Sequence, residues 1–127
     1  MKYAFLLYPH QNIRYRQSLE VIRAVPEDVK AGRNYLSFPE GTRSRNGNTM
    51  GEFHGGSFRC AIKSKCPIIP MAFVDSFKVL DQKGSKPVTV QLHYLDPIPY
   101  EEYKDLKTVE VAELVKRRIA AVIEANT

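Results

Sequence analysis

A long stretch with one apolar side closes the chain and needs a surface to pack on. Between Thr108 and Asn126 the apolar residues recur at spacings of three and four, with acidic residues near the start. This pattern predicts an amphipathic helix with Thr108 as its N-cap residue. Such a helix buries its stripe against another layer of structure. The stripe comprises Val111, Leu114, Val115, Ile119 and Val122.

Three segments have the composition of strands that this helix could cover. Residues 34–38 are short and aromatic, residues 67–74 form an apolar run, and residues 88–95 alternate apolar and polar side chains. Helical spacing occurs in residues 18–30 and 57–65. The order helix, strand, loop, helix, strand, strand, helix predicts an α/β fold, a layered sheet of mixed strands covered by helices.

The first helical stretch, Ser18–Lys30, contains a proline and is followed by a glycine. Pro26 is expected to break or restart the helix, because it lacks an N–H donor and its ring clashes with the preceding turn. Gly32 is the predicted C-cap, since glycine readily adopts the left-handed conformation that ends many helices.

Length and charge limit the classes of function. The 127 residues suffice for one compact domain. A net charge of +5 suits a phosphorylated small molecule, an anionic membrane surface or a nucleic acid. Nucleic-acid binding is not predicted, because no recognition motif is present and the aromatic side chains fall on predicted core strands. Charge does not choose between the other two partners.

No apolar run is long enough to span a bilayer or to form a signal-peptide core. The longest, residues 3–8 and 67–74, fall far below the roughly 20 residues that a spanning helix needs. This favours a cytoplasmic protein.

The two cysteines, Cys60 and Cys66, have no histidine or acidic residue at metal-ligand spacing. Neither a metal site nor a disulfide framework is therefore expected, and both thiols are predicted to be reduced.

A glycine-rich loop with clustered cations follows the first predicted strand. Residues 39–56 contain five of the seven glycines, and loops of this length in a compact domain are usually functional. The loop opens with the sequence Phe-Pro-Glu-Gly-Thr-Arg-Ser-Arg at residues 38–45. Two guanidinium groups and two hydroxyls on a flexible backbone are suited to gripping a phosphate, although a solvated turn has a similar composition.

The order of residues 38–45 resembles the third signature block of the glycerolipid acyltransferases, which acylate lysophosphatidic acid or glycerol 3-phosphate. Residues 55–59 are similar to the family's lysine-glycine-alanine-phenylalanine segment, and residues 66–71 to its fourth block. The resemblance implies a partial glycerol-3-phosphate acyltransferase-like fold. Residues 1–17 are then an atypical N-terminal segment, and residues 18–127 are the C-terminal part of the acyltransferase domain.

The resemblance also implies roles for the matching residues. Part of the loop would hold glycerol phosphate, and the fourth block would shape the acyl-chain side, although a structural role for its prolines remains equally open. No metal or organic cofactor is implied, and the co-substrate would be an acyl-CoA or acyl carrier protein thioester. The implied substrate-binding residues are Glu40, Gly41, Thr42, Arg43 and Arg45, and the acyl-side residues are Ile68, Ile69 and Pro70.

The family's catalytic pair is missing from this sequence. The family has a histidine that acts as general base, followed five residues later by an aspartate that orients it. The residues found five positions after the three histidines are Tyr15, Arg59 and Ile98. No catalytic residue is therefore predicted, and His54 in the loop is interpreted as a partly exposed polar residue.

The family's second block, with an aspartate and an arginine that help to bind the acceptor phosphate, is also incomplete. Arg14 or Arg16 stands where the family arginine would be, but the aspartate is absent.

The resemblance implies a part in phospholipid biosynthesis. The family activity transfers an acyl group from a thioester to 1-acyl-sn-glycerol 3-phosphate, and this truncated chain is expected to be inactive alone. It would lie peripherally at the inner membrane face, on an anionic surface. An unpaired sheet edge would favour self-association. The alternative is a non-catalytic module that binds anionic lipid headgroups through Arg43, Arg45 and residues 116–118.

Overall fold

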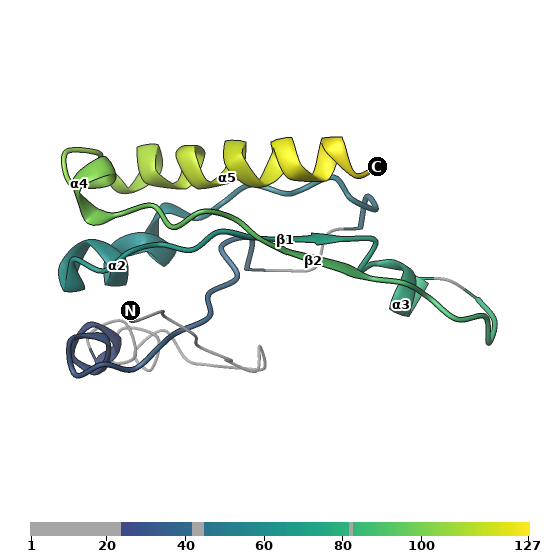
Figure 1. Cartoon of the computed structure of the whole chain (residues 1–127), viewed down its shortest axis with the longest axis horizontal. Helices are drawn as coiled ribbons and strands as arrows, with labels where there is room; N and C mark the ends of the chain where they lie inside the picture. Colours follow the sequence, from purple (N-terminus) through teal and green to yellow (C-terminus); the bar gives the residue numbers. More distant parts are fainter. Residues whose placement is uncertain (1–23, 42–44, 82) are drawn as a thin grey trace.

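The computed structural model describes residues 24–41, 45–81 and 83–127 (Figure 1). Residues 24–30 are helical. The elements that follow are η1 (Gly55–Phe58), α2 (Arg59–Ser64), β1 (Met71–Val74), α3 (Lys78–Asp81), β2 (Gln91–Tyr94), α4 (Tyr100–Tyr103) and α5 (Thr108–Ala125). The predicted α/β class is confirmed. No helix within these described ranges is long and apolar enough to cross a membrane.

The sheet of the described residues is one antiparallel pair of strands. In β1 and β2, Phe73 lies opposite Leu92. Ile68 and Ile98 extend the pairing by two backbone hydrogen bonds of 2.9 and 2.7 Å. Both strands are shorter than the predicted runs. On the β1 side, Pro67 and Pro70 have no N–H to donate and interrupt the ladder.

The predicted strand at residues 34–38 is wrong, because this segment has no strand assignment. A strand needs a neighbour to share its backbone hydrogen bonds, and β1 pairs only with β2 in the part of the chain that the structure describes. Tyr35 is instead anchored by a hydrogen bond from its hydroxyl to the Asp28 carboxylate.

Helix α5 lies along one face of the sheet, and the helical residues 24–30 lie on the other side of it (Figure 1). The alternation of β1 sends Ala72 and Val74 into the core, where both are fully buried. The main core joins α5, β1, η1 and α4. Its buried residues are Phe53, Phe58, Ala72, Val74, Ile98, Tyr103, Val111, Ala112, Val115, Ile119 and Ile123.

The start of α5 differs by one residue from the prediction. Lys107, and not Thr108, is the N-cap residue, and its backbone N–H donates to the Glu110 carboxylate at 2.6 Å. A glutamate at the third helical position often reaches back in this way. The acidic side chain in the first turn therefore supplies the cap that was assigned to the threonine hydroxyl.

The helical residues 24–30 end as predicted at Gly32, whose φ is +102°. The Gly32 N–H donates to the Val29 carbonyl and the Arg33 N–H to the Asp28 carbonyl, which together form a Schellman motif. The chain is helical on both sides of Pro26, so the helix is not broken at the proline itself. The expected start at Ser18 lies outside the described residues.

Candidate functional site

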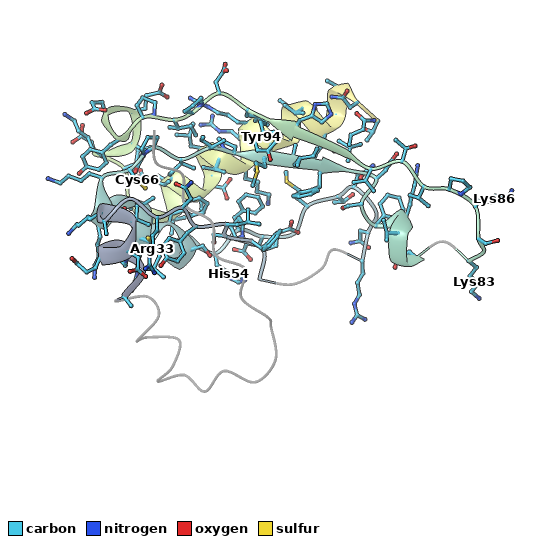
Figure 2. All side chains as sticks on the ribbon, turned by 60° about the horizontal axis from the view of Figure 1, so that its bottom comes forward. Arg33, His54, Cys66, Lys83, Lys86 and Tyr94 are labelled. Atoms are coloured by element: carbon cyan, nitrogen blue, oxygen red, sulfur yellow. The ribbon has the colours of Figure 1, made fainter. Side chains whose placement is uncertain are left out.

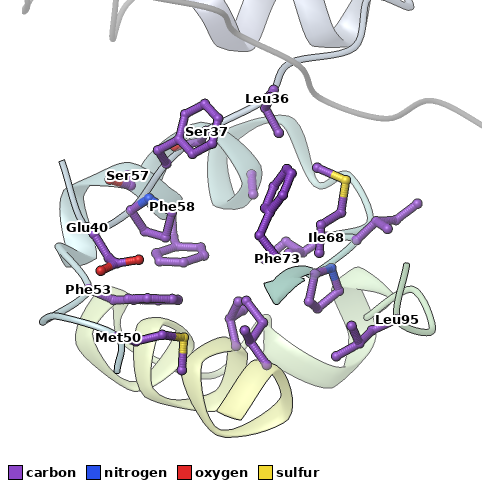
Figure 3. A pocket seen from close by; sticks show the side chains of 18 of the residues that line it. Leu36, Ser37, Glu40, Met50, Phe53, Ser57, Phe58, Ile68, Phe73 and Leu95 are labelled. Atoms are coloured by element: carbon purple, nitrogen blue, oxygen red, sulfur yellow. The ribbon is translucent and has the colours of Figure 1, made fainter. Parts of the chain in front are cut away.

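A large apolar cavity lies between α5, the sheet and the glycine-rich loop (Figure 3). Its volume is about 1000 Å³, which is at the upper end of the roughly 300–1,000 Å³ of small-molecule sites. Aliphatic and aromatic side chains from distant parts of the sequence form most of its wall. Among them are Val25, Leu36, Met50, Phe53, Phe58, Ile68, Ile69, Met71, Phe73, Phe77, Leu95, Val115, Ile119 and Ile123.

The turn that carries Glu40 is tied to the far end of the loop. The Gly51 N–H donates to Glu40 Oε2 at 2.8 Å, and the His54 N–H donates to the Pro39 carbonyl, also at 2.8 Å. The start of the glycine-rich loop, residues 39–40, therefore lies beside residues 51–54 near its end.

Gly41 fills a position that other residues adopt with strain. Its φ is +67°, and an added Cβ would lie 3.4 Å from Cδ2 of His54. The imidazole thus packs directly over the glycine, which fits a backbone that must turn sharply here.

The predicted phosphate-binding residues divide into three groups. Glu40 lines the cavity, and Gly41 follows it in the turn. Arg45 is exposed and lies outside the cavity lining. Thr42 and Arg43 lie outside the described residues. The structure therefore places Glu40 on the cavity wall, with Gly41 next to it in the turn, and leaves Arg45 facing solvent.

The predicted acyl-side residues Ile68, Ile69 and Pro70 all line the cavity. Figure 3 shows Ile68 and Leu95 on the wall opposite Glu40, with Phe73 in the middle of the cavity between the two walls. Among the described lining residues, Glu40 is the one charged side chain, and it lies opposite apolar side chains.

Sequence reasoning missed the aromatic part of the wall. Phe53 and Phe58 are buried next to Glu40 (Figure 3), and Phe77 lies beyond β1. The available signal was the pair of phenylalanines within and just after a glycine-rich loop, since large apolar residues are often buried.

Neither described histidine forms part of a histidine–aspartate pair. His93 on β2 has its Nε2 at 2.9 Å from Oε1 of Gln91, and the exposed His54 covers Gly41. Within the described ranges no three metal-ligating side chains cluster. His10 lies outside these ranges.

A second set of hydrogen bonds holds the loop to the end of β1, and the sequence analysis did not predict it. Asn48 Nδ2 donates to Asp75 Oδ1 at 2.9 Å, and the Asp75 N–H donates to Asn48 Oδ1 at 2.8 Å. Lys78 approaches the other carboxylate oxygen at 2.8 Å. The Lys78 and Asn48 donors hold the pKa of Asp75 below its usual value.

Both cysteines are free, and both line the cavity. Cys66 is buried and Cys60 is half-buried. Burial, reinforced by the neighbouring Cys66, raises the pKa of the Cys60 thiol to about 11. The thiol is therefore protonated at neutral pH.

The cations of the described surface do not gather at the cavity. Lys83 and Lys86 lie at one end of the molecule, far from Arg33 and His54 (Figure 2). On α5, Arg118 is paired with Glu102 at 2.8 Å, which neutralises part of the basic segment 116–118.

The fold is similar to that of a solved enzyme. The crystal structure of the 1-acyl-sn-glycerophosphate (LPA) acyltransferase PlsC from Thermotoga maritima matches with a TM-score of 0.72 and 24% sequence identity. The match covers 84% of this chain and 46% of the PlsC chain.

Curated relatives with similar sequences are also acyltransferases. A 1-acyl-sn-glycerol-3-phosphate acyltransferase of Cocos nucifera is 29% identical over 98 residues, 76% of this chain and 30% of the relative. The alpha enzyme of Mus musculus is 33% identical over 67 residues, 50% of this chain and 23% of the relative. This chain therefore spans less than a third of these relatives.

The family itself is shown by a model of conserved positions. The model described as Acyltransferase matches residues 8–74, slightly more than half of the chain. The matched range includes the turn with Glu40, the glycine-rich loop and the apolar run into β1. The chain belongs to the acyltransferase family.

Proposed function

We propose that this chain forms the acceptor- and acyl-binding half of an enzyme that acylates 1-acyl-sn-glycerol 3-phosphate. The observation that carries the proposal is the position of Glu40 on the wall of a large apolar cavity. A lysophospholipid has the matching division, with a polar glycerol phosphate joined to a hydrocarbon chain. The names of the family relatives point to the same acceptor.

The apolar wall would bind the acyl chain by the hydrophobic effect. Each buried methylene contributes about 0.8 kcal/mol, so about ten methylenes against Ile68, Ile69 and Phe73 would contribute roughly 8 kcal/mol before the cost of association. Phosphate recognition is assigned to Arg43 and Arg45 with the backbone of Gly41 and Thr42, because guanidinium groups bind phosphate oxygens in pairs. Glu40 would accept a hydrogen bond from a glycerol hydroxyl.

Acyl transfer also needs a base for the attacking hydroxyl. No histidine of this sequence is followed five residues later by an aspartate. No catalytic base is assigned within these 127 residues, and we expect turnover to need a histidine–aspartate pair from outside them. The acyl donor is a thioester of coenzyme A or of acyl carrier protein, and the direct transfer between thioester and hydroxyl needs no metal.

Binding of lysophosphatidic acid to the 127-residue chain tests the proposal. The control ligand is lysophosphatidylcholine with the same acyl chain, which lacks the phosphate monoester. We expect Arg43→Ala to weaken binding of lysophosphatidic acid about tenfold. The control is Arg33→Ala, which removes a cation at the Schellman motif and is expected to change this affinity less than twofold. Equal affinity for both lipids in the unchanged chain would reject the proposed acceptor.

An acyl-transfer assay separates binding from catalysis. The chain alone, given a labelled acyl thioester and lysophosphatidic acid, is expected to show no turnover. A longer protein that carries the histidine–aspartate pair upstream of the same residues is expected to turn over. Turnover by the 127 residues alone would show that another group acts as base, with His54 the first to replace.

The alternative, a module that binds anionic headgroups without catalysis, has less support. Its basic segment 116–118 is partly neutralised by the Arg118–Glu102 pair. Family membership also favours the acyltransferase. Loss of lipid binding at moderate salt, with no preference for glycerol phosphate over inorganic phosphate, would revive the alternative.

The proposed acceptor is a lipid, so we also propose a peripheral position on an anionic inner membrane face. Co-sedimentation with vesicles containing phosphatidylglycerol, compared with neutral phosphatidylcholine vesicles, tests this. Equal sedimentation would reject a role for surface charge.

Self-association is proposed for the chain on its own. Leu92 and Tyr94 are exposed on β2, and an apolar strand at the edge of a sheet tends to pair with a second copy. Light scattering at tens of micromolar is expected to give a mass of two chains or more. A monomer under these conditions would contradict the proposal.

A further inference from the structure

Two reciprocal hydrogen bonds join Asn48 to Asp75, 27 residues later in the chain. The Asn48 side chain donates through Nδ2 to Asp75 Oδ1 at 2.9 Å and accepts through Oδ1 from the Asp75 N–H at 2.8 Å. An amide that both donates to and accepts from one residue fixes the relative orientation of the two segments better than a single bond does.

The bonded partners sit at two sharp turns. Asp75 directly follows β1 and has a φ of +64°, a conformation that aspartate tolerates better than most residues. Gly47, next to Asn48, also has a φ of +64°, and an added Cβ would lie 3.7 Å from the Phe77 ring. The loop is thus joined to the segment after β1 by the two Asn48–Asp75 hydrogen bonds, and Gly47 lies beside the Phe77 ring.

The charge of Asp75 is matched locally. Its second carboxylate oxygen pairs with Lys78 at 2.8 Å, with the side chains 25% and 34% exposed. Both carboxylate oxygens of Asp75 therefore have a partner, Oδ1 with Asn48 and Oδ2 with Lys78. It does not present an unpaired negative charge to an anionic ligand at the loop.

The Asn48–Asp75 hydrogen bonds lie close in the chain to the proposed phosphate-binding residues. Arg45 precedes Asn48 by three residues, which places its Cα within about 10 Å of the Cα of Asn48. On the other side, Glu40 Oε2 accepts from the Gly51 N–H. The described loop residues 45–50 thus lie next to two restraints, the bond of Gly51 to Glu40 and the bonds of Asn48 to Asp75.

We propose that Asn48 and Asp75 are positioning residues that hold the described loop residues 45–48, and with them Arg45, against the end of β1. This inference rests on the proposed function for its consequence, which is the affinity for a phosphate monoester. Its structural part, the restraint of the loop, stands separately. Small displacements of binding groups are costly because a guanidinium must meet the phosphate at a defined distance and angle.

An exchange of the two side chains tests the pair. Asn48→Asp places a carboxylate against the Asp75 carboxylate and abolishes the side-chain bond. Asp75→Asn leaves an acceptor for the Asn48 amide and is expected to be mild. The double variant Asn48→Asp/Asp75→Asn restores the bond with donor and acceptor exchanged. Lys78→Met, which removes the ion pair and keeps both Asn48 bonds, is the matched control.

The first readout is the rate of trypsin cleavage after Arg45 in the 127-residue chain without ligand. We expect Asn48→Asp to be cut about tenfold faster than the unchanged chain, because local opening exposes the bond. The double variant and Lys78→Met are expected to stay within about twofold of it. Circular dichroism checks that each variant is folded, and Asn48→Ala replaces Asn48→Asp if that variant is not.

The second readout is the dissociation constant of lysophosphatidic acid. The expected pattern is the same, with about tenfold weaker binding for Asn48→Asp and recovery in the double variant. Unchanged cleavage in Asn48→Asp, or failure of the double variant to recover, would overturn the pair as a restraint. Faster cleavage with unchanged affinity would overturn its role in binding.

The two proposals fail in different ways. Failure of the unchanged chain to prefer lysophosphatidic acid over lysophosphatidylcholine rejects the proposed function. In that case the cleavage rates still decide whether Asn48 and Asp75 restrain the loop.

Discussion

The two sides of the cavity are held together by different forces. The side formed by α5, β1 and η1 contains the main core, in which Val74, Ile98 and Val111 are completely buried. The side formed by residues 24–30 and the loop has only a small described cluster of Val25, Val29 and Cys66. Its other described connections are the packing of Met50 and Phe53 against the main core and the hydrogen bonds of Glu40 and Asn48. Apolar burial therefore supports one wall, and individual hydrogen bonds support much of the other.

This difference has a physical consequence. Buried apolar area contributes to stability in proportion to its extent, whereas a single exposed hydrogen bond contributes about 1 kcal/mol or less. The loop side is then expected to open locally without unfolding of the α5 side, as binding elements often do.

The largest expected effect is on the α5 side. Ile98→Ala should lower the free energy of unfolding by about 2–5 kcal/mol, because it removes a fully buried side chain and leaves a cavity. Urea denaturation followed by circular dichroism measures the change. The control Val79→Ala, at a 60% exposed position, is expected to change stability by less than about 0.5 kcal/mol. Similar losses for both variants would remove the basis of the comparison.

Thiol chemistry at Cys60 reports on opening of the loop side. A pKa raised to about 11 lies about two units above that of an ordinary thiol, so the reactive thiolate is about 100-fold scarcer at neutral pH. Iodoacetamide labelling followed by mass spectrometry is expected to be correspondingly slow. The rate should rise as the pH approaches 11. Fast labelling at pH 7.5 in the folded protein would show that the small cluster is already open.

A matched pair of substitutions gives the smallest and sharpest test. Val111 and Val29 are equally buried, with 0% and 2% exposure, but they belong to different clusters. Val111→Ala is expected to cost about 2 kcal/mol of unfolding free energy, and Val29→Ala about 1 kcal/mol, since the small cluster can relax around the lost methyl groups. Equal costs in urea denaturation would mean that the two sides unfold as one unit.

Much of the α5 side could be predicted from the sequence. The apolar stripe of α5 and the alternation in β2 are local patterns that reflect which face is buried. The left-handed Gly32 is equally local. The sequence favours Thr108 as the N-cap, because threonine is a preferred residue at that position. In the structure the N-cap is Lys107, one residue earlier, and its N–H bonds to the Glu110 side chain.

The loop side could be predicted only where a motif was present. Glu40, on the loop side, and Ile68–Pro70, on the opposite wall, are predicted from the resemblance to the family's sequence blocks, and all of them line the cavity. The segment 34–38 was misassigned because strand formation depends on a neighbour that no local pattern reveals. The Asn48–Asp75 bonds join residues 27 positions apart, so no spacing rule could identify them.

The face of α5 that faces the cavity also belongs to the main core. Val115, Ile119 and Ile123, spaced one helical turn apart, appear in both. A hydrocarbon chain bound in the cavity is thus equivalent to an additional buried side chain, and binding and folding are thermodynamically linked. A ligand at 100 times its dissociation constant adds about 2.7 kcal/mol to the stability of the folded state. The proposed acyl ligand would therefore also be a part of the hydrophobic interior.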